Sequence, residues 1–142
     1  TAPEIAASEA GTLVKLAPLC AAYAELAALA DCVVVEGVGG WGAPLSDALD
    51  QSALAHALDL PVLLVVGLRL GCINHARLTA RAIQSDGCRL LGWIGNRIDP
   101  EFAHAGATLA ILQRVIDAPC LGVLRHGAPD PAGLDLTQLR ER

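Results

Sequence analysis

Residues 33–47 read VVVEGVGGWGAPLSD, an apolar run that ends in an acid and continues into a glycine-rich segment. Its three consecutive valines are β-branched and apolar without alternation, which is typical of a parallel strand buried on both faces. Glu36 ends this predicted strand, and a glycine-rich turn follows it. Ligands of open α/β sheets bind at the carboxyl ends of the strands, so the stretch indicates a phosphate and metal site. A solvated strand-end charge before a plain tight turn is the alternative interpretation.

Strands and helices are predicted to alternate along the remainder of the chain. Strands are expected at residues 32–36, 60–67, 90–96 and 120–124, and helices at residues 14–30, 52–58, 74–85 and 107–116, with a last helix capped by Asp135. This alternation predicts an α/β fold with a doubly wound, mostly parallel sheet. Because no linker interrupts it, residues 1–142 are predicted to form a single domain.

The composition excludes several classes of protein. No apolar run approaches the roughly 20 residues that cross a bilayer, and no leader-like segment is visible, so we expect a cytoplasmic protein without membrane contact. The formal net charge is −5 and the ten Lys and Arg residues are scattered, which argues against nucleic acid as a partner. The five cysteines form no C-x-x-C pair and are expected to be reduced, mostly buried thiols. The chain contains no Met, which points to a fragment or a processed chain.

Two further strand ends carry sequences that suit ligand binding. In GLRLGCINHA, residues 67–76, two glycines bracket a loop, and Cys72 to Asn74 are expected to open a helix whose free N–H groups favour an anion. Asn96 ends the run LLGWIGN, and its amide matches the N6/N7 edge of adenine. A helix cap at Asn74 and a turn role for Asn96 are the alternatives. We expect these strand ends and Glu36 to meet at one edge of the sheet.

Taken together, VVVEGVGGWGAPLSD, LPVLLVVGLRLGCINHARLTARAI and LLGWIGNRID resemble the dethiobiotin synthetase family of the biotin pathway. The likeness runs from Ala2 and Pro3 to about Leu124 and implies a fold of the P-loop NTPase type. The phosphate-binding segment G-x-x-x-x-G-K-[ST] is absent, and Lys15 is the only lysine. The resemblance therefore implies the C-terminal part of such a fold, with the N-terminal strands and the catalytic lysines missing.

The resemblance also implies an activity. Such enzymes are ligases that bind ATP and Mg²⁺ and act as homodimers on 7,8-diaminononanoate and CO₂; the carbamate formed is phosphorylated and then cyclised to dethiobiotin. Carried onto this sequence, Glu36 is the metal ligand. The ATP contacts are Glu36, Gly37, Val38, Gly39, Asn96 and Arg97, and the loop that receives the substrate's carboxylate tail from the neighbouring subunit is Gly71, Cys72, Ile73 and Asn74.

The sequence departs from the family in two places. Arg97 stands where many members have Asp, and residues 125–127 read RHG where a Pro-containing nucleotide loop is common. The chain by itself is expected to be inactive. One alternative is a non-catalytic dimerisation or regulatory module with a P-loop-like fold. Another is a relative such as a cobyrinate amidation enzyme or a partition-type ATPase, but those lack the GCINH loop.

Overall fold

The computed structural model describes residues 2–128 and 130–137. Its internal contacts divide the chain into two compact units, which are described separately: Thr1–Leu60 with Asp86–Cys88, and Pro61–Ser85 with Arg89–Arg142. The single domain expected for residues 1–142 stays a prediction. The helix expected after Asp135 lies mostly outside the described residues. Within them, no helix has the length and apolar character needed to cross a membrane.

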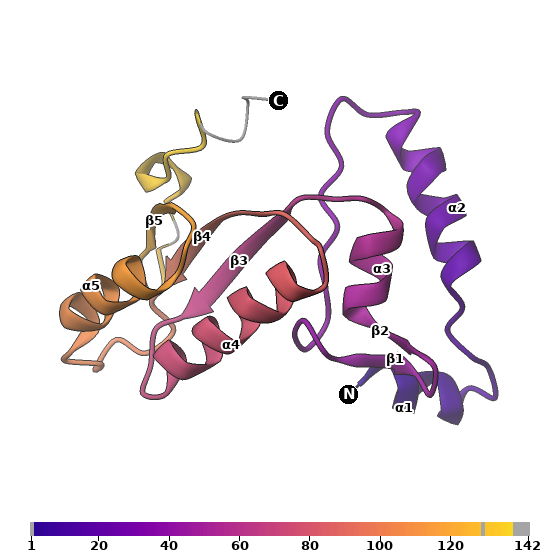
Figure 1. Ribbon diagram of the computed structural model, residues 1–142, viewed down its shortest axis with the longest axis horizontal. Coiled ribbons are helices and arrows are strands. Elements are labelled where there is room, and N and C mark those ends of the chain that lie inside the picture. Colours follow the sequence, from indigo (N-terminus) through magenta and orange to yellow (C-terminus); the bar gives the residue numbers. More distant parts are fainter. Residues whose placement is uncertain (1, 129, 138–142) are drawn as a thin grey trace. The chain divides into compact units, whose positions relative to one another are not determined.

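The second unit is a parallel α/β sheet (Figure 1). Its strands are β3 (Val62–Gly67), β4 (Leu90–Asn96) and β5 (Cys120–Leu124), hydrogen-bonded in that order. The crossover helices are α4 (Cys72–Ser85) and α5 (Ala105–Val115). Both strand pairs are parallel, which confirms the α/β class and three of the four predicted strands. Each helix begins two residues before its predicted start.

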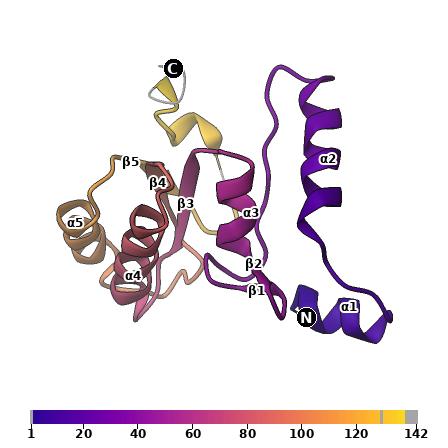
Figure 2. The same ribbon diagram turned by 45° about the vertical axis from the view of Figure 1, so that its right-hand side comes forward.

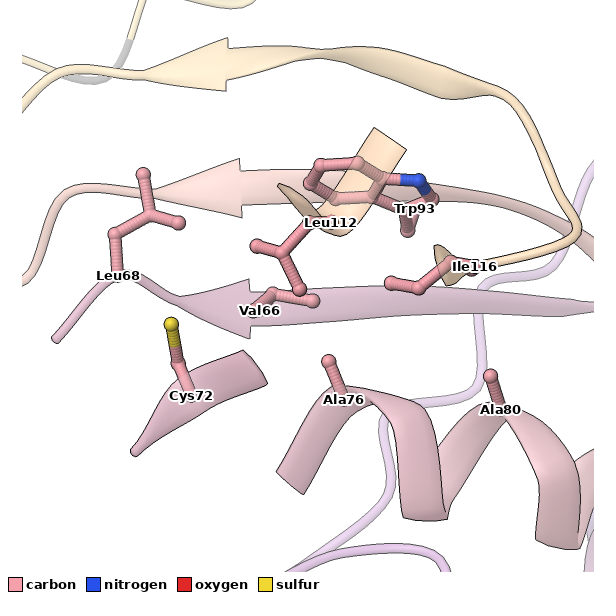
Figure 3. Packing of buried hydrophobic residues seen from close by; sticks show 8 residues of the cluster. All are labelled: Val66, Leu68, Cys72, Ala76, Ala80, Trp93, Leu112 and Ile116. Carbon is pink, nitrogen blue, oxygen red and sulfur yellow. The ribbon is translucent and has the colours of Figure 1, made fainter. Parts of the chain in front are cut away.

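One face of this sheet packs against α4 and α5 (Figure 3). On α4, Ala76 and Ala80 point toward β3, and such small side chains let a helix approach a sheet closely. Trp93 of β4 is fully buried beside Leu112 of α5. The full cluster is Val66, Leu68, Cys72, Ala76, Ala80, Trp93, Leu112 and Ile116. The core of the second unit therefore lies between these helices and the sheet.

The edges of the second unit differ. Beyond β5 the chain returns through η1 (Pro131–Gly133), and Leu134 forms a bridge with Gly122. A Cβ atom at Gly122 would lie 2.5 Å from the carbonyl oxygen of Gly133, so this close approach requires glycine. At the opposite end of the strand order, β3 is an edge strand, and its Val65 is 55% exposed.

The first unit combines three helices with a small hairpin. It contains α1 (Pro3–Glu9), α2 (Leu16–Ala27), the antiparallel pair β1 (Pro44–Ser46) and β2 (Leu49–Asp50), and α3 (Gln51–Ala57). The sequence did not predict α1 or the hairpin, because both elements are short. The helix α2 is shorter at both ends than predicted and contains no buried residue.

The strand predicted at residues 32–36 is wrong. These residues have no secondary structure, and Figure 2 shows the chain between α2 and β1 as a coil. Val34 is 88% exposed and Val35 is 41% exposed. A strand requires a neighbour that accepts and donates its backbone hydrogen bonds, and no strand in the described ranges pairs with this segment. Its apolar composition alone therefore does not make it a strand.

Candidate functional site

Glu36 opens an exposed loop in the first unit. Its carboxylate makes no hydrogen bond to any described residue, and Gly37 to Gly40 are exposed as well. Gly39 has a φ of +83°, a left-handed conformation that glycine adopts without strain. The amide of Ala43 then donates to the carbonyl oxygen of Gly40 at 3.1 Å, which closes a tight turn. The turn predicted from the glycines is present, although the strand before it is not.

The Glu36 carboxylate suits Mg²⁺ better than a metal ion that is coordinated by protein side chains alone. Among the residues that the structure describes, no group of three or more His, Cys, Asp or Glu side chains could hold a metal. Mg²⁺ keeps several waters and takes one or two carboxylates together with substrate phosphates. An exposed Glu36 beside backbone N–H groups fits that donor set. These features are consistent with Glu36 as the metal ligand, and that role stays a prediction.

Gln51 holds this loop, and sequence reasoning missed it. The N–H of Val38 donates to its side-chain Oε1 at 3.4 Å, and its own N–H donates to the carbonyl oxygen of Ala43 at 2.9 Å. A Cβ atom at Gly37 would lie 3.2 Å from Cδ of Gln51. The contact joins residues 13 positions apart, so no local pattern of the sequence reveals it.

Asp50 fixes the start of α3, the helix that carries Gln51. Its Oδ1 accepts the N–H of Ala53 at 3.0 Å and the hydroxyl of Ser52 at 2.8 Å. These hydrogen bonds, the one from Ala53 first, lower the pKa of the Asp50 carboxyl, because they favour its charged form. Asp50 is thus an N-cap of the kind that stabilises helix termini.

A second bond anchors the glycine-rich loop within the first unit. The indole N–H of Trp41 donates to Oδ2 of Asp86 at 2.6 Å. Asp86 belongs to the short segment Asp86–Cys88, which clusters with the N-terminal residues. The loop is therefore held by one side chain near each end, Gln51 near its start and Trp41 near its finish.

Asn96 lies at the carboxyl end of β4 in the second unit. Its carbonyl oxygen accepts the N–H of Leu68 at 2.7 Å and that of Ile98 at 2.9 Å. Its side-chain amide has no hydrogen-bond partner within the described part of the chain. The structure therefore brings Asn96 beside the loop after β3, which is two of the three predicted strand ends, and leaves the amide available to a ligand. The predicted place of Glu36 at the same edge stays a prediction. The role of Asn96 as an adenine reader stays a prediction.

Arg97 connects β4 to the chain after β5. Its N–H donates to the carbonyl oxygen of Leu124 at 3.0 Å, and its own carbonyl oxygen lies 3.2 Å from Nδ1 of His126. Its Nε atom is buried and has no hydrogen-bond partner in residues 2–128 or 130–137. A buried donor without an acceptor is costly, so an anionic ligand here would supply what the described residues do not.

The GCINH loop ends at the start of α4. The N–H of Cys72 already donates to the carbonyl oxygen of Arg69 at 3.1 Å, and the Cys72 side chain is only 4% exposed within the core. The N–H groups of Ile73 and Asn74 find no acceptor among the described residues. Cys72 therefore offers a ligand neither an exposed side chain nor a free N–H group, whereas the next two residues offer the free donors of a helix start.

The predicted site residues thus form two sets, each held by contacts within its own unit. Glu36, Gly37, Val38 and Gly39 belong to the first unit, and Gly71 to Asn74 with Asn96 and Arg97 belong to the second. Within the second set, the loop after β3 and the end of β4 lie at the same edge of the sheet. The ligands assigned to both sets stay predictions.

Comparisons with known proteins identify relatives of this chain. Residues 1–128 match the AAA domain family. The ATP-dependent dethiobiotin synthetase BioD of Xylella fastidiosa strain 9a5c is 56% identical over 135 residues, which are 94% of this chain and 60% of that protein. The protein of the same name from Xanthomonas campestris pv. campestris strain 8004 is 56% identical over 121 residues, 85% of this chain and 54% of the relative. The chain therefore spans about 60% of the Xylella fastidiosa protein and 54% of the Xanthomonas one.

Proposed function

Because the chain belongs to the AAA domain family and closely resembles dethiobiotin synthetases, we propose that it is the greater part of such an enzyme. The complete enzyme would convert 7,8-diaminononanoate and CO₂ to dethiobiotin in biotin biosynthesis, with ATP and Mg²⁺. The observation that carries this proposal is the 56% identity over 94% of the chain. All ten residues assigned to ligands lie inside the matched range 1–128.

The proposed chemistry has three steps. One substrate amine attacks CO₂ and forms a carbamate, whose oxygen then attacks the γ-phosphorus of ATP and releases ADP. The second amine attacks the carbonyl carbon of the mixed anhydride and expels phosphate, which closes the ureido ring. Phosphorylation is needed because the carbamate oxygen is a poor leaving group, and a bound Mg²⁺ supplies charge neutralisation on the phosphates.

The chain's own residues would bind and orient the reactants. Glu36 would hold the metal through one oxygen, and the backbone N–H groups of the following loop would face phosphate oxygens. The free amide of Asn96 would hydrogen-bond to the adenine edge, and the buried Nε of Arg97 would face the nucleotide. These groups position the triphosphate, which is most of what catalysis of phosphoryl transfer requires.

The start of α4 would receive the far end of the substrate. The free N–H groups of Ile73 and Asn74 suit a carboxylate, and Leu70, just before them, is 90% exposed and suits an apolar chain. Diaminononanoate has a carboxylate at the end of such a chain. In the proposed homodimer this loop serves the site of the neighbouring subunit.

The phosphate-binding lysine motif is not in the sequence, so we propose that the 142 residues alone are inactive. The same absence favours the second candidate, a non-catalytic dimerisation or regulatory module. The test compares the purified chain with the polypeptide read from the upstream coding sequence, each given diaminononanoate, labelled bicarbonate and MgATP. Mass spectrometry should detect labelled dethiobiotin from the longer polypeptide alone.

Two outcomes would contradict this proposal. Product from the 142 residues alone would show that no further phosphate-binding part is needed. A longer polypeptide that folds, contains the lysine motif and still forms no product would favour the regulatory module. A variant of the longer polypeptide with its motif lysine changed to Ala provides the matched inactive control.

A further inference from the structure

Gln51 contacts the glycine-rich loop near both of its ends. Its side-chain Oε1 accepts the N–H of Val38, and its backbone N–H donates to the carbonyl oxygen of Ala43. Its side chain also covers Gly37, where a Cβ atom would come within 3.2 to 3.4 Å of three of its atoms. One residue therefore contacts the loop both just after Glu36 and five residues later.

The residue is itself well anchored. It is the first residue of α3, directly after the N-cap Asp50, and it follows β2 without an intervening loop. Leu45 of β1 is 5% exposed and Leu54 of α3 is 9% exposed, so the hairpin and the helix each contribute a buried side chain. The Gln51 side chain thus extends from a fixed position to a loop that lacks a strand behind it.

Glu36 has no comparable support of its own. Residues 32–36 form no strand, and the Glu36 carboxylate makes no hydrogen bond in the described structure. Between residues 32 and 40, the bond from Val38 to Gln51 is the one side-chain hydrogen bond that the described residues show. This contact is therefore the side-chain support closest in the chain to Glu36.

We propose that Gln51 is a positioning residue for Glu36 and for the N–H groups that follow it. This rests on the proposed function of Glu36 as the magnesium ligand. Gln51 touches neither metal nor substrate in this proposal; it keeps the loop in the conformation that binds them. Its loss should weaken Mg²⁺ use and leave binding of diaminononanoate unchanged, because that substrate's tail is assigned to the start of α4.

The test uses the complete polypeptide and two independent measurements. The first is the hydrogen-exchange rate of the Val38 amide, followed by NMR on ¹⁵N-labelled protein. Gln51→Ala should raise it roughly threefold to tenfold, the range expected for one hydrogen bond. Gln51→Glu keeps the acceptor oxygen and should restore slow exchange. Gln84→Ala is the matched control, since Gln84 is exposed on α4 and makes no hydrogen bond in the described structure.

The second measurement is the Mg²⁺ concentration that gives half-maximal turnover. Gln51→Ala should raise it about threefold to tenfold, with the KM for diaminononanoate unchanged. A purely structural role would instead lower the yield of folded enzyme and change every kinetic parameter alike. Gln84→Ala should leave both measurements at wild-type values.

The possible results distinguish the positioning role of Gln51 from the metal-binding function proposed for Glu36. Unchanged Val38 exchange in Gln51→Ala overturns the positioning role, whatever the activity. Faster exchange with an unchanged Mg²⁺ midpoint, in an enzyme that Glu36→Gln inactivates, also overturns it while the proposed function stands. If Glu36→Gln leaves the Mg²⁺ dependence unchanged, the function proposed for Glu36 falls, and the role of Gln51 falls with it.

Discussion

Two stretches of this chain have nearly the same apolar character and opposite structural outcomes. VLLVVG, residues 62–67, is the edge strand β3, paired in parallel with β4. VVVEG, residues 33–37, has no secondary structure. Val66 is 5% exposed, whereas Val34 is 88% exposed. A buried-strand sequence therefore becomes a strand only where another strand completes its hydrogen bonds.

The contrast extends to the residues predicted to bind ligands in each unit. Asn96 and the GCINH loop are carried by paired strands and by a helix packed in a core. Glu36 follows an unpaired segment, and Gln51 and Trp41 hold the loop after it. Burial of a valine side chain stabilises a fold by about 1.5 to 3 kcal/mol, and Val66 contributes this while Val34 does not. The glycine-rich loop after Glu36 is therefore held in place by a few polar contacts rather than by apolar burial.

The largest expected effect tests whether Glu36, in the exposed segment, is needed for activity but not for the stability of the fold. Glu36→Gln in the complete polypeptide should lower Mg²⁺-dependent turnover by about a hundredfold, because a neutral amide replaces an anionic oxygen ligand. Its thermal midpoint should stay at the wild-type value, since the carboxylate is exposed and makes no described hydrogen bond. Steady-state rates across a Mg²⁺ titration measure the effect. Equal rates at limiting Mg²⁺ would reduce Glu36 to a surface charge.

The same substitution in the two stretches tests the structural contrast directly. Val66→Ala should lower the free energy of unfolding by about 2 kcal/mol, through lost transfer free energy and a residual cavity. Val34→Ala should change it by less than about 0.5 kcal/mol. Urea denaturation followed by circular dichroism compares the two variants. If Val34→Ala proves as costly as Val66→Ala, the segment around residue 34 is packed in solution.

A third prediction concerns the start of α4, which packs in the core of the second unit. Asn74→Ala should raise the KM for diaminononanoate roughly tenfold, about 1.4 kcal/mol, and leave that for ATP unchanged. Mixing it with Glu36→Gln should restore part of the activity, since each mixed dimer then contains one site with both residues intact. A higher KM for ATP, or heterodimers without recovered activity, would refute the cross-subunit assignment.

The smallest effect concerns the helix start that supports Gln51. Asp50→Ala should lower the free energy of unfolding at pH 7 by about 1 kcal/mol, the usual cost of losing an N-cap. The folded state lowers the pKa of Asp50 below its ordinary value of 3.8, so its contribution is present above that pH and is lost as the pH falls through the folded value.

The difference between wild type and Asp50→Ala should therefore shrink as the pH falls below 3.8. Urea denaturation at pH 7 and at a series of acidic values measures it. Asp117→Ala, which removes an exposed carboxylate without a described hydrogen bond, is the control. A difference that stays constant across the acidic range would show that the Asp50 hydrogen bonds do not stabilise the helix start.

Much of the second unit could be predicted from the sequence. The runs that became β3, β4 and β5 are apolar, of strand length and bounded by turn residues, and each pairs with another strand that the chain contains. The loop after β3 was recognised by its glycines, and α4 ends at Ser85 as predicted. These signals are local, and the strands that they predict pair with one another in the folded structure.

The amino-acid sequence alone indicates the α/β class, the resemblance to dethiobiotin synthetases and the candidate ligand residues. The folded structure corrects two expectations, because residues 32–36 stay unpaired and Cys72 is the one buried cysteine of the five that were expected to be mostly buried. It also shows that Gln51 and Trp41 hold the glycine-rich loop. The physical reason is the range of the interactions. Apolar patterns and turn residues act over a few neighbouring positions, whereas these contacts join positions 13 and 45 residues apart and exist only once the chain has folded.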